Sequence, residues 1–195
     1  MVFTNKKTIL IVAGEESGDL HGSSLVGEMD QRMPDLSFFG IGGDRLQDGG
    51  VETIEHTDNM AVMGFSEVVS KYRFLRKVFQ NIVKEIDRRN PERAILIDYP
   101  GFNLRLAKKL KERGVPVTYF ISPQVWAWKE KRVEVIRKCV DQLLCIFPFE
   151  EAWYAKRGVD ATFVGHPFMD MPKPKISREE FFQQHEFDPD RTTIA

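Results

Sequence analysis

Asp98 is the side chain of this sequence best suited to accept a proton. It ends the apolar run 94–97, so its carboxyl group should be partly desolvated. Desolvation raises a carboxyl pKa toward the range in which a carboxylate takes a proton from a hydroxyl nucleophile. The residues that follow allow a second interpretation, because Asp-x-Pro-Gly is a favourable β-turn in which the aspartate bonds to its own turn backbone. The residue types alone leave both interpretations open.

A second polar loop, residues 14–22, reads Gly-Glu-Glu-Ser-Gly-Asp-Leu-His-Gly. Its carboxylates and Ser17 suit hydrogen bonds to sugar hydroxyls, whereas the alternative makes Ser17 or Asp19 a helix N-cap and the glycines turn formers. The glycines recur every fourth residue instead of as G-x-G-x-x-G, and the carboxylates would repel a phosphate from a helix N-terminus. The loop therefore disfavours dinucleotide binding.

Aromatic and basic side chains meet in two further segments. Residues 122–129 read Ser-Pro-Gln-Val-Trp-Ala-Trp-Lys, and tryptophans beside basic residues can stack on a sugar, sit at a lipid headgroup layer or pack a core. Residues 66–89 show helical apolar spacing, with basic side chains crowded around Tyr72 after the apolar loop 60–65. Such a segment can rest on an anionic membrane surface, or it can be an ordinary amphipathic helix with a solvated basic edge.

Alternating strand-like and helix-like segments must position these loops. Strands are predicted at residues 8–13, 36–41, 93–98, 115–121, 142–147 and 161–164, and helices at residues 19–32, 66–89, 103–113, 131–138 and 150–156. The alternation indicates an α/β fold, and most of the strands are continuously apolar, as strands covered on both faces are. We therefore predict a Rossmann-like parallel sheet with helices on both faces, whose ligands bind beyond the carboxyl ends of the strands.

Composition narrows the class of protein further. The chain has 195 residues, 42% of them hydrophobic, which is enough for one core, and its formal net charge of −1 argues against a protein that coats nucleic acid. The longest apolar run, Ile9–Ala13, is far shorter than the roughly 20 residues of a membrane-spanning helix, so we expect a cytoplasmic chain. Cys139 and Cys145 lack paired spacing and are expected to be reduced core residues. The histidines show no ligand spacing, and we expect no metal site.

The character of the chain changes after residue 164. A polar, proline-bearing stretch follows, then a predicted short helix at residues 177–185, and the final Thr-Thr-Ile-Ala resembles the opening of another strand. We therefore expect residues 1–170 to form the Rossmann-like domain. Residues 171–195 are expected to hold a linker, the short helix and the start of a truncated second domain.

Six ordered segments carry a family resemblance. They are Ala-Gly-Glu-Glu-Ser-Gly-Asp-Leu-His-Gly (13–22), Ala-Val-Met-Gly-Phe-Ser-Glu-Val (61–68), Ile-Asp-Tyr-Pro-Gly-Phe-Asn-Leu-Arg-Leu-Ala (97–107), Ser-Pro-Gln-Val-Trp-Ala-Trp-Lys (122–129), Pro-Phe-Glu (148–150) and Val-Gly-His-Pro (164–167). From about residue 8 to residue 170 the sequence resembles the lipid-A-disaccharide synthases. The resemblance implies the N-terminal, acceptor-binding half of a GT-B glycosyltransferase, in which two Rossmann-like domains face each other across a cleft.

The resemblance also implies a reaction and its participants. The family transfers diacylglucosamine from UDP-diacylglucosamine to lipid X (diacylglucosamine 1-phosphate), with inversion and release of UDP, and without a metal ion or organic cofactor. It acts peripherally on the cytoplasmic face of the inner membrane and binds no nucleic acid. A C-terminal domain that begins with a Leu-Pro-Gly-Ser-Arg loop holds most of the UDP-sugar contacts, and the full-length form is implied to be a homodimer. That loop is absent from these 195 residues, so we expect the chain to be inactive alone.

Site residues follow from the matched motifs. The implied general base is Asp98. The implied acceptor-binding residues are Ser17, Gly18, Asp19, Asn103, Gln124 and Trp126. The implied membrane-contact residues are Met63, Phe65, Val69, Tyr72, Arg73 and Arg76. Two rival hypotheses are a non-catalytic lipid- or membrane-binding module and a generic nucleotide-binding Rossmann domain, and the acidic first loop disfavours the second.

Overall fold

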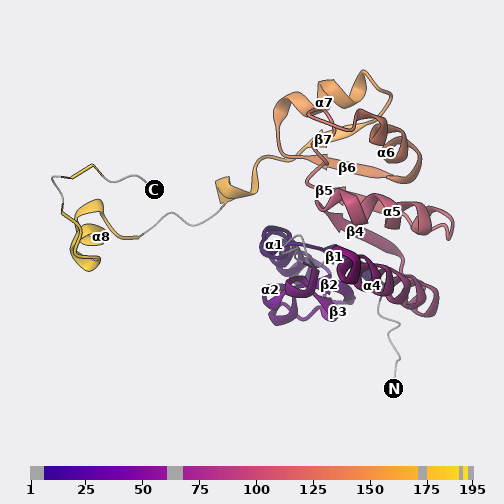
Figure 1. Ribbon diagram of the computed structural model, residues 1–195, viewed down its shortest axis with the longest axis horizontal. Helices are drawn as coiled ribbons and strands as arrows, with labels where there is room; N and C mark the ends of the chain where they lie inside the picture. Colours follow the sequence, from indigo (N-terminus) through magenta and orange to yellow (C-terminus); the bar gives the residue numbers. More distant parts are fainter. Residues whose placement is uncertain (1–6, 61–67, 171–174, 189–190, 193–195) are drawn as a thin grey trace. The chain divides into compact units, whose positions relative to one another are not determined.

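A computed structural model (Figure 1) describes residues 7–60, 68–170, 175–188 and 191–192, with the backbone alone at residues 68–71. The chain divides into two compact units, Met1–Gly165 and His166–Ala195, which are described separately. The first unit therefore ends five residues before the predicted boundary at residue 170.

A seven-stranded, all-parallel sheet forms the centre of the first unit, in the order β3-β2-β1-β4-β5-β6-β7. Its strands are β1 Lys7–Ala13, β2 Leu36–Gly42, β3 Glu52–His56, β4 Arg93–Ile97, β5 Val117–Phe120, β6 Gln142–Cys145 and β7 Ala161–Phe163. The order reverses between β1 and β4, which is the point where ligands bind in open α/β sheets. The predicted Rossmann-like fold is confirmed.

Helices connect the strands. They are α1 Glu16–Arg32, α2 Asp44–Asp48, α3 Thr57–Met60, α4 Val68–Arg89, α5 Pro100–Lys111, α6 Val133–Cys139 and α7 Pro148–Ala155, with a 3₁₀ turn at Glu130–Arg132. The five predicted helices of this unit are present, whereas β3, α2 and α3 were not predicted. β3 was missed because an edge strand can be polar, and here Glu52 forms an ion pair with Arg89 at the end of α4.

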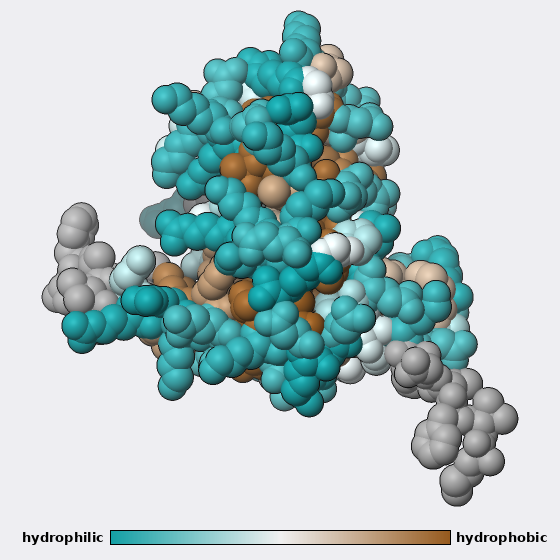
Figure 2. Space-filling model, turned by 90° about the vertical axis from the view of Figure 1, so that its right-hand side faces the viewer, coloured by the Kyte–Doolittle hydropathy of each residue, from teal (hydrophilic) through white to brown (hydrophobic). Residues whose placement is uncertain are grey.

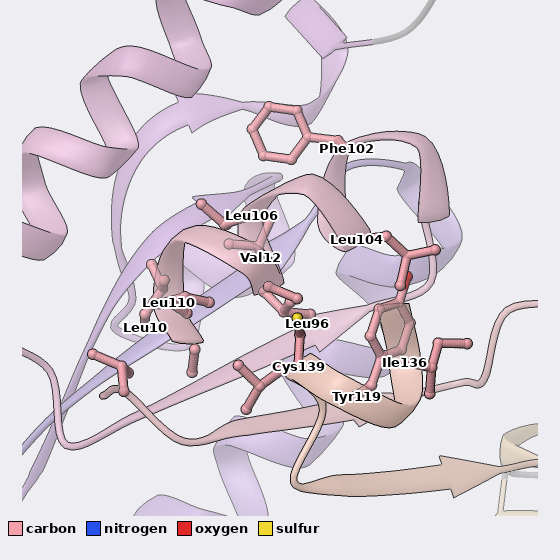
Figure 3. Close-up of a cluster of buried hydrophobic side chains, with 14 of the residues drawn as sticks. Leu10, Val12, Leu96, Phe102, Leu104, Leu106, Leu110, Tyr119, Ile136 and Cys139 are labelled. Carbon is pink, nitrogen blue, oxygen red and sulfur yellow. The ribbon is translucent and has the colours of Figure 1, made fainter. Parts of the chain in front are cut away.

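Two apolar layers cover the sheet, one on each face. Along β1, Leu10 and Val12 belong to the cluster shared with α4, α5 and α6, and Ile9 and Ile11 to the cluster shared with α1 and α2. Figure 3 shows side chains from β1, β4, β5, α5 and α6 meeting in the first cluster. This alternation explains the continuously apolar strands, since both faces of the sheet are buried. On the face shown in Figure 2, hydrophilic side chains dominate and hydrophobic ones reach the surface in patches.

A glycine at position 40 lets β1 and β2 lie close together. Gly40 has φ +153°, and a Cβ there would overlap with the backbone carbonyl oxygen of Ile11. The pairing register between β2 and β3 shifts at this point, between Gly40 and Ile41. Only glycine tolerates this combination of dihedral angle and contact.

The second unit holds a 3₁₀ turn at Pro167–Asp170 and helix α8, Arg178–Gln184, which confirms the predicted short helix. Ser177 and Glu180 form a reciprocal capping box at the start of α8. Phe182 packs against Phe187 with ring centroids 5.8 Å apart. The strand expected at the C-terminus falls mostly on residues 193–195, outside the described residues. Among the described helices, none has the length and apolar character needed to cross a membrane.

Candidate active site

A doubly left-handed turn follows β4. Asp98 and Tyr99 have φ values of +41° and +46°, a region that residues other than glycine rarely occupy. Pro100 then takes the first position of α5, where its missing N–H costs no hydrogen bond. The segment therefore opens a helix instead of forming the alternative β-turn, and α5 begins three residues before its predicted start at residue 103. Backbone strain of this kind clusters at functional sites.

Two buried side chains hold this turn from below. The Nδ2 of Asn103 donates hydrogen bonds to the carbonyl oxygens of Ile97, at 3.1 Å, and Asp98, at 2.8 Å. The hydroxyl of Tyr119 donates to the same Asp98 carbonyl at 2.5 Å. Both side chains are fully buried. Asn103, an implied acceptor-binding residue, thus lies beneath Asp98 and positions its backbone.

The carboxyl group of Asp98 has the electrostatics expected of a base. Its pKa is raised, first by burial and second by the negative charge of Glu15, while a hydrogen bond from the Tyr99 N–H opposes the shift. This hydrogen bond agrees with one part of the β-turn interpretation, in which Asp98 bonds to the backbone of its own turn. Within the described residues no side chain donates a hydrogen bond to this carboxylate. A half-buried carboxylate with a raised pKa is well suited to accept a proton near neutral pH.

The loop after β1 meets this turn across the reversal of strand order. A Cβ placed on Gly14 would overlap with the ring of Tyr99, so the ring lies directly against the Gly14 backbone. Glu15 and Ser17 are exposed beside it, whereas Gly18 is buried, its Cβ position 3.3 Å from the Cβ of Ala13. Of the implied acceptor residues in this loop, Ser17 alone presents a side chain to solvent.

Asp19 differs from its expectation as a residue that touches the acceptor. Its side chain is fully buried and accepts hydrogen bonds from the backbone N–H groups of Gly43 at 2.6 Å, Arg45 at 3.1 Å and Leu46 at 3.2 Å. These groups form the start of α2, where N–H groups lack helical partners. In this structure Asp19 therefore caps α2, a helix other than its own, and its carboxylate faces the interior instead of solvent.

A buried carboxylate that belongs to the Pro-Phe-Glu motif, but was not predicted as a site residue, organises the tryptophan loop. Glu150 is 1% exposed, and its Oε1 accepts hydrogen bonds from Ser122 Oγ at 2.9 Å and Trp126 Nε1 at 3.1 Å. Its Oε2 accepts one from the Phe147 N–H at 3.1 Å. Glutamate at the third position of the helix, after Pro-Phe, is one half of a capping box and is the signal that could have identified it, although the N-cap Phe147 has no side-chain acceptor for the other half.

The polar and aromatic groups of this loop face solvent. Trp126 is 36% exposed and packs edge-on against Phe149, with ring centroids 5.1 Å apart. Trp128 is 65% exposed, with the Nζ of Lys129 4.3 Å from its ring centroid, and Gln124 is exposed as well. Core packing therefore does not explain Trp128, whereas Trp126 is held by Glu150 and Phe149 and exposes about a third of its surface.

Removing the Glu150 carboxylate should destabilise this part of the fold. We expect Glu150→Ala to lower the free energy of unfolding by about 3 kcal/mol, because one buried and two partly buried donors would lose their acceptor. Glu150→Gln keeps one acceptor oxygen and should lose less than half of that. Urea denaturation measures both, with Glu28→Ala, which removes an exposed ion pair to Arg32, as the control. Equal losses in the Glu150→Ala and control variants would contradict this role.

Four of the implied membrane-contact residues, Val69, Tyr72, Arg73 and Arg76, belong to the start of α4. Met63 and Phe65 fall outside the described residues, and the side chain of Val69 is not described. Tyr72 is 61% exposed, and Arg73 and Arg76 are exposed too. Further along α4 the helix packs on the sheet through its buried side chains Val78, Ile82 and Ile86. The helix is amphipathic, and its first turns leave aromatic and basic groups in solvent.

The cysteines and the side chains that could bind a metal ion are the remaining reactive groups. Cys139 and Cys145 are both free and buried, which confirms the expectation of reduced core residues. Burial raises the pKa of the Cys145 thiol to about 11, with smaller contributions from Glu150 and Glu151. Over the described residues, no three His, Cys, Asp or Glu side chains gather in a way that could hold a metal ion.

Comparison with known protein families gives a single answer over nearly the whole chain. The family model described as "Lipid-A-disaccharide synthetase" matches residues 9–195. A lipid-A-disaccharide synthase of Syntrophus aciditrophicus is 48% identical over 191 residues, which cover 98% of this chain and 50% of the relative. Those of Geobacter metallireducens and Coxiella burnetii are 46% and 40% identical, over 97% and 98% of this chain. The chain spans about half the length of the curated relatives it matches.

Solved structures share the fold at low sequence identity. The S. aureus MnaA structure with UDP aligns with a TM-score of 0.63 and 10% identity, over 92% of this chain and 51% of its own. The UDP-GlcNAc 2-epimerase of Neisseria meningitidis, bound to UDP-GlcNAc, gives 0.58 and 9%, over 84% and 47%. At this identity the similarity concerns the fold alone.

Proposed function

The chain belongs to the lipid-A-disaccharide synthetase family, and we propose that it supplies the acceptor site and the general base of a glycosyltransferase. The proposed reaction transfers diacylglucosamine from UDP-diacylglucosamine to lipid X. The strained, partly desolvated Asp98 at the reversal of strand order is the observation that carries the proposal. Its position next to the exposed loop after β1 supports this role, because ligands of such sheets bind beyond the carboxyl ends of the strands.

The proposed chemical step is an inverting displacement. Asp98 takes the proton of the acceptor's primary hydroxyl as that oxygen attacks the anomeric carbon of the donor. A new carbon–oxygen bond forms there, the bond from this carbon to the UDP oxygen breaks, and UDP leaves with the electron pair. Asn103 and Tyr119 fix the Asp98 backbone during the step, and Ser17, Gln124 and Trp126 contribute polar and aromatic surface for the acceptor sugar.

The remaining partners are also proposals. Donor contacts are assigned to the half of the relatives that this chain does not cover. The exposed Tyr72, Arg73 and Arg76 support peripheral contact with the cytoplasmic face of the inner membrane, since aromatic and basic groups favour an anionic lipid surface. We propose in addition that the full-length protein forms a homodimer, as the resemblance implies.

Turnover tests the proposal directly. The 195-residue chain is compared with a chimera that joins it to the half of the Syntrophus aciditrophicus relative that it does not cover. We expect the chimera to form disaccharide and UDP from the two substrates, and the chain alone to give no turnover above background. A folded chimera without turnover, or a chain active by itself, would contradict the proposal.

The same assay separates a second candidate, a lipid- or membrane-binding module without catalysis. The exposed aromatic and basic start of α4 favours this candidate. Such a module would give no turnover in the chimera, whether or not Asp98 is intact. Turnover that disappears with Asp98 excludes it.

A further inference from the structure

A groove runs between α4 and α5 and begins beside Asp98. Its first hollow, of about 440 Å³, is lined by Leu75 and Phe79 of α4, by Phe102 of α5 and by Tyr99 of the left-handed turn. A second hollow, of about 610 Å³, continues between the same helices past Val83. Phe79 lines both hollows, and its ring packs edge-on against Phe102 with centroids 5.4 Å apart. The hollows therefore form two compartments of one groove, divided at Phe79.

The first compartment shares Tyr99 with the turn that carries Asp98. Tyr99 follows Asp98 directly in the chain, and its ring both lies against Gly14 and lines the hollow. A molecule that fills the first compartment is therefore held next to the proposed base. The second compartment lies further along α4, and the path from Tyr72 to Val83 spans about 16 Å at 1.5 Å per residue.

Cationic side chains are distributed unevenly along the groove. Arg76 and Arg105 line the first compartment, and neither has an ion-pair partner among the residues whose side chains are described. In the second compartment Arg113 bonds to Asp87 at 2.6 Å and Lys109 bonds to Glu112 at 2.8 Å, whereas Lys84 has no ion-pair partner among the residues whose side chains are described. The first compartment thus offers two unpaired guanidinium groups, whereas beyond Phe79 two of the three cations are neutralised and only the Lys84 ammonium is unpaired.

This polarity matches an amphiphile with an anionic head and an apolar tail. We propose that the groove binds the acceptor, with the phosphate monoester on Arg76 and Arg105 and one acyl chain passing over Phe79 toward Val83. The inference rests on the proposed function, because that function supplies an acylated sugar phosphate as acceptor. Guanidinium groups suit a phosphate since their N–H groups can donate in pairs.

Two charge-matched variants test the head of the groove. Arg76→Gln/Arg105→Gln removes the unpaired cations, one from each helix. Lys77→Gln/Lys108→Gln removes the same charge from exposed positions of the same helices that line neither compartment. Binding of lipid X to the 195-residue chain is measured in neutral detergent micelles. We expect the groove pair to weaken binding at least tenfold and the control pair by less than twofold.

Two further measurements test the phosphate and the tail. Acceptor without its phosphate should bind the wild-type chain and the groove pair equally. Phe79→Trp, which fills the junction of the compartments, should reduce the preference for a long acyl chain over a short one, and circular dichroism checks its fold. Equal weakening by the groove and control pairs would indicate attraction to anionic lipid surfaces in general and would overturn the proposal, as would an unchanged chain-length preference.

These outcomes are distinct from those of the turnover assay. Binding that depends on Arg76 and Arg105, together with an inactive chimera, would leave the groove assigned and reject the proposed function. An active chimera in which the groove and control pairs behave alike would keep the function and reject the groove.

Discussion

Replacing Asp98 with asparagine is expected to reduce turnover of the chimera by about 10²- to 10⁴-fold, the usual contribution of a general base. Asparagine has nearly the same shape but takes no proton from the acceptor hydroxyl. Because burial and Glu15 raise the carboxyl pKa, the acidic limb of the pH–rate profile should lie above the ordinary value of 3.8. Steady-state kinetics across pH measure both effects. An Asp98→Asn chimera with wild-type turnover would remove Asp98 from the mechanism.

The same substitution should raise thermal stability at neutral pH. Since the folded state raises the pKa of Asp98, it binds the proton more tightly than the unfolded chain does. Below the ordinary value of 3.8 both states are protonated, and the substitution should change the Tm little. As pH rises through the folded-state pKa, the wild-type carboxyl ionises in a poorly solvated site, and the free energy of unfolding of the wild-type chain falls. Asparagine does not ionise, so the variant keeps that stability. Melting curves at acidic and neutral pH test this. A Tm at pH 7 that is lower for Asp98→Asn than for the wild-type chain, with equal Tm values at acidic pH, would contradict it.

Gly14→Ala is expected to lower the turnover number of the chimera by about 10²-fold, although a single methyl group is added. The new Cβ would overlap with the ring of Tyr99, including Cγ, which is bonded directly to the Tyr99 Cβ, so we expect relief of the overlap to shift the turn that presents Asp98. A displacement of a catalytic group by about 1 Å lowers the rate by a factor of this order.

Gly27→Ala is the matched control for this prediction. Gly27 lies within α1, and a Cβ there would meet no atom within 4 Å. It should leave turnover unchanged and stabilise the helix by about 0.5–1 kcal/mol. The comparison requires kcat and the urea midpoint of both variants. Similar turnover in the two variants would show that the contact between Gly14 and Tyr99 does not position the base.

The parts of this fold that could be predicted are those that local patterns determine. Continuous apolar runs located β1 and β4, and the alternation of elements predicted the Rossmann-like sheet and therefore the edge at which Asp98 lies. β3 escaped because its polar residues satisfy an edge position, and α2 because five residues carry too short a pattern.

The site was harder to predict, since its essential contacts join distant segments. Asp19 caps a helix that begins 25 residues later, and Glu150 bonds to side chains more than 20 residues before it. Nothing near Asp98 in the sequence indicates that Asn103 and Tyr119 donate hydrogen bonds to its carbonyl oxygen, or that its backbone is left-handed. Such roles depend on tertiary structure, whereas the raised pKa of Asp98 could be predicted from its place at the end of a buried strand.

Because both native cysteines are buried, a single cysteine introduced on the surface of this chain can be labelled selectively. Maleimide dyes react with exposed thiolates, and Cys145 is fully buried with a pKa of about 11, while Cys139 is 9% exposed. A cysteine introduced at exposed Lys108 would therefore react first, without removal of either native cysteine. A fluorophore attached there would report on α5 beside the groove in the otherwise native chain.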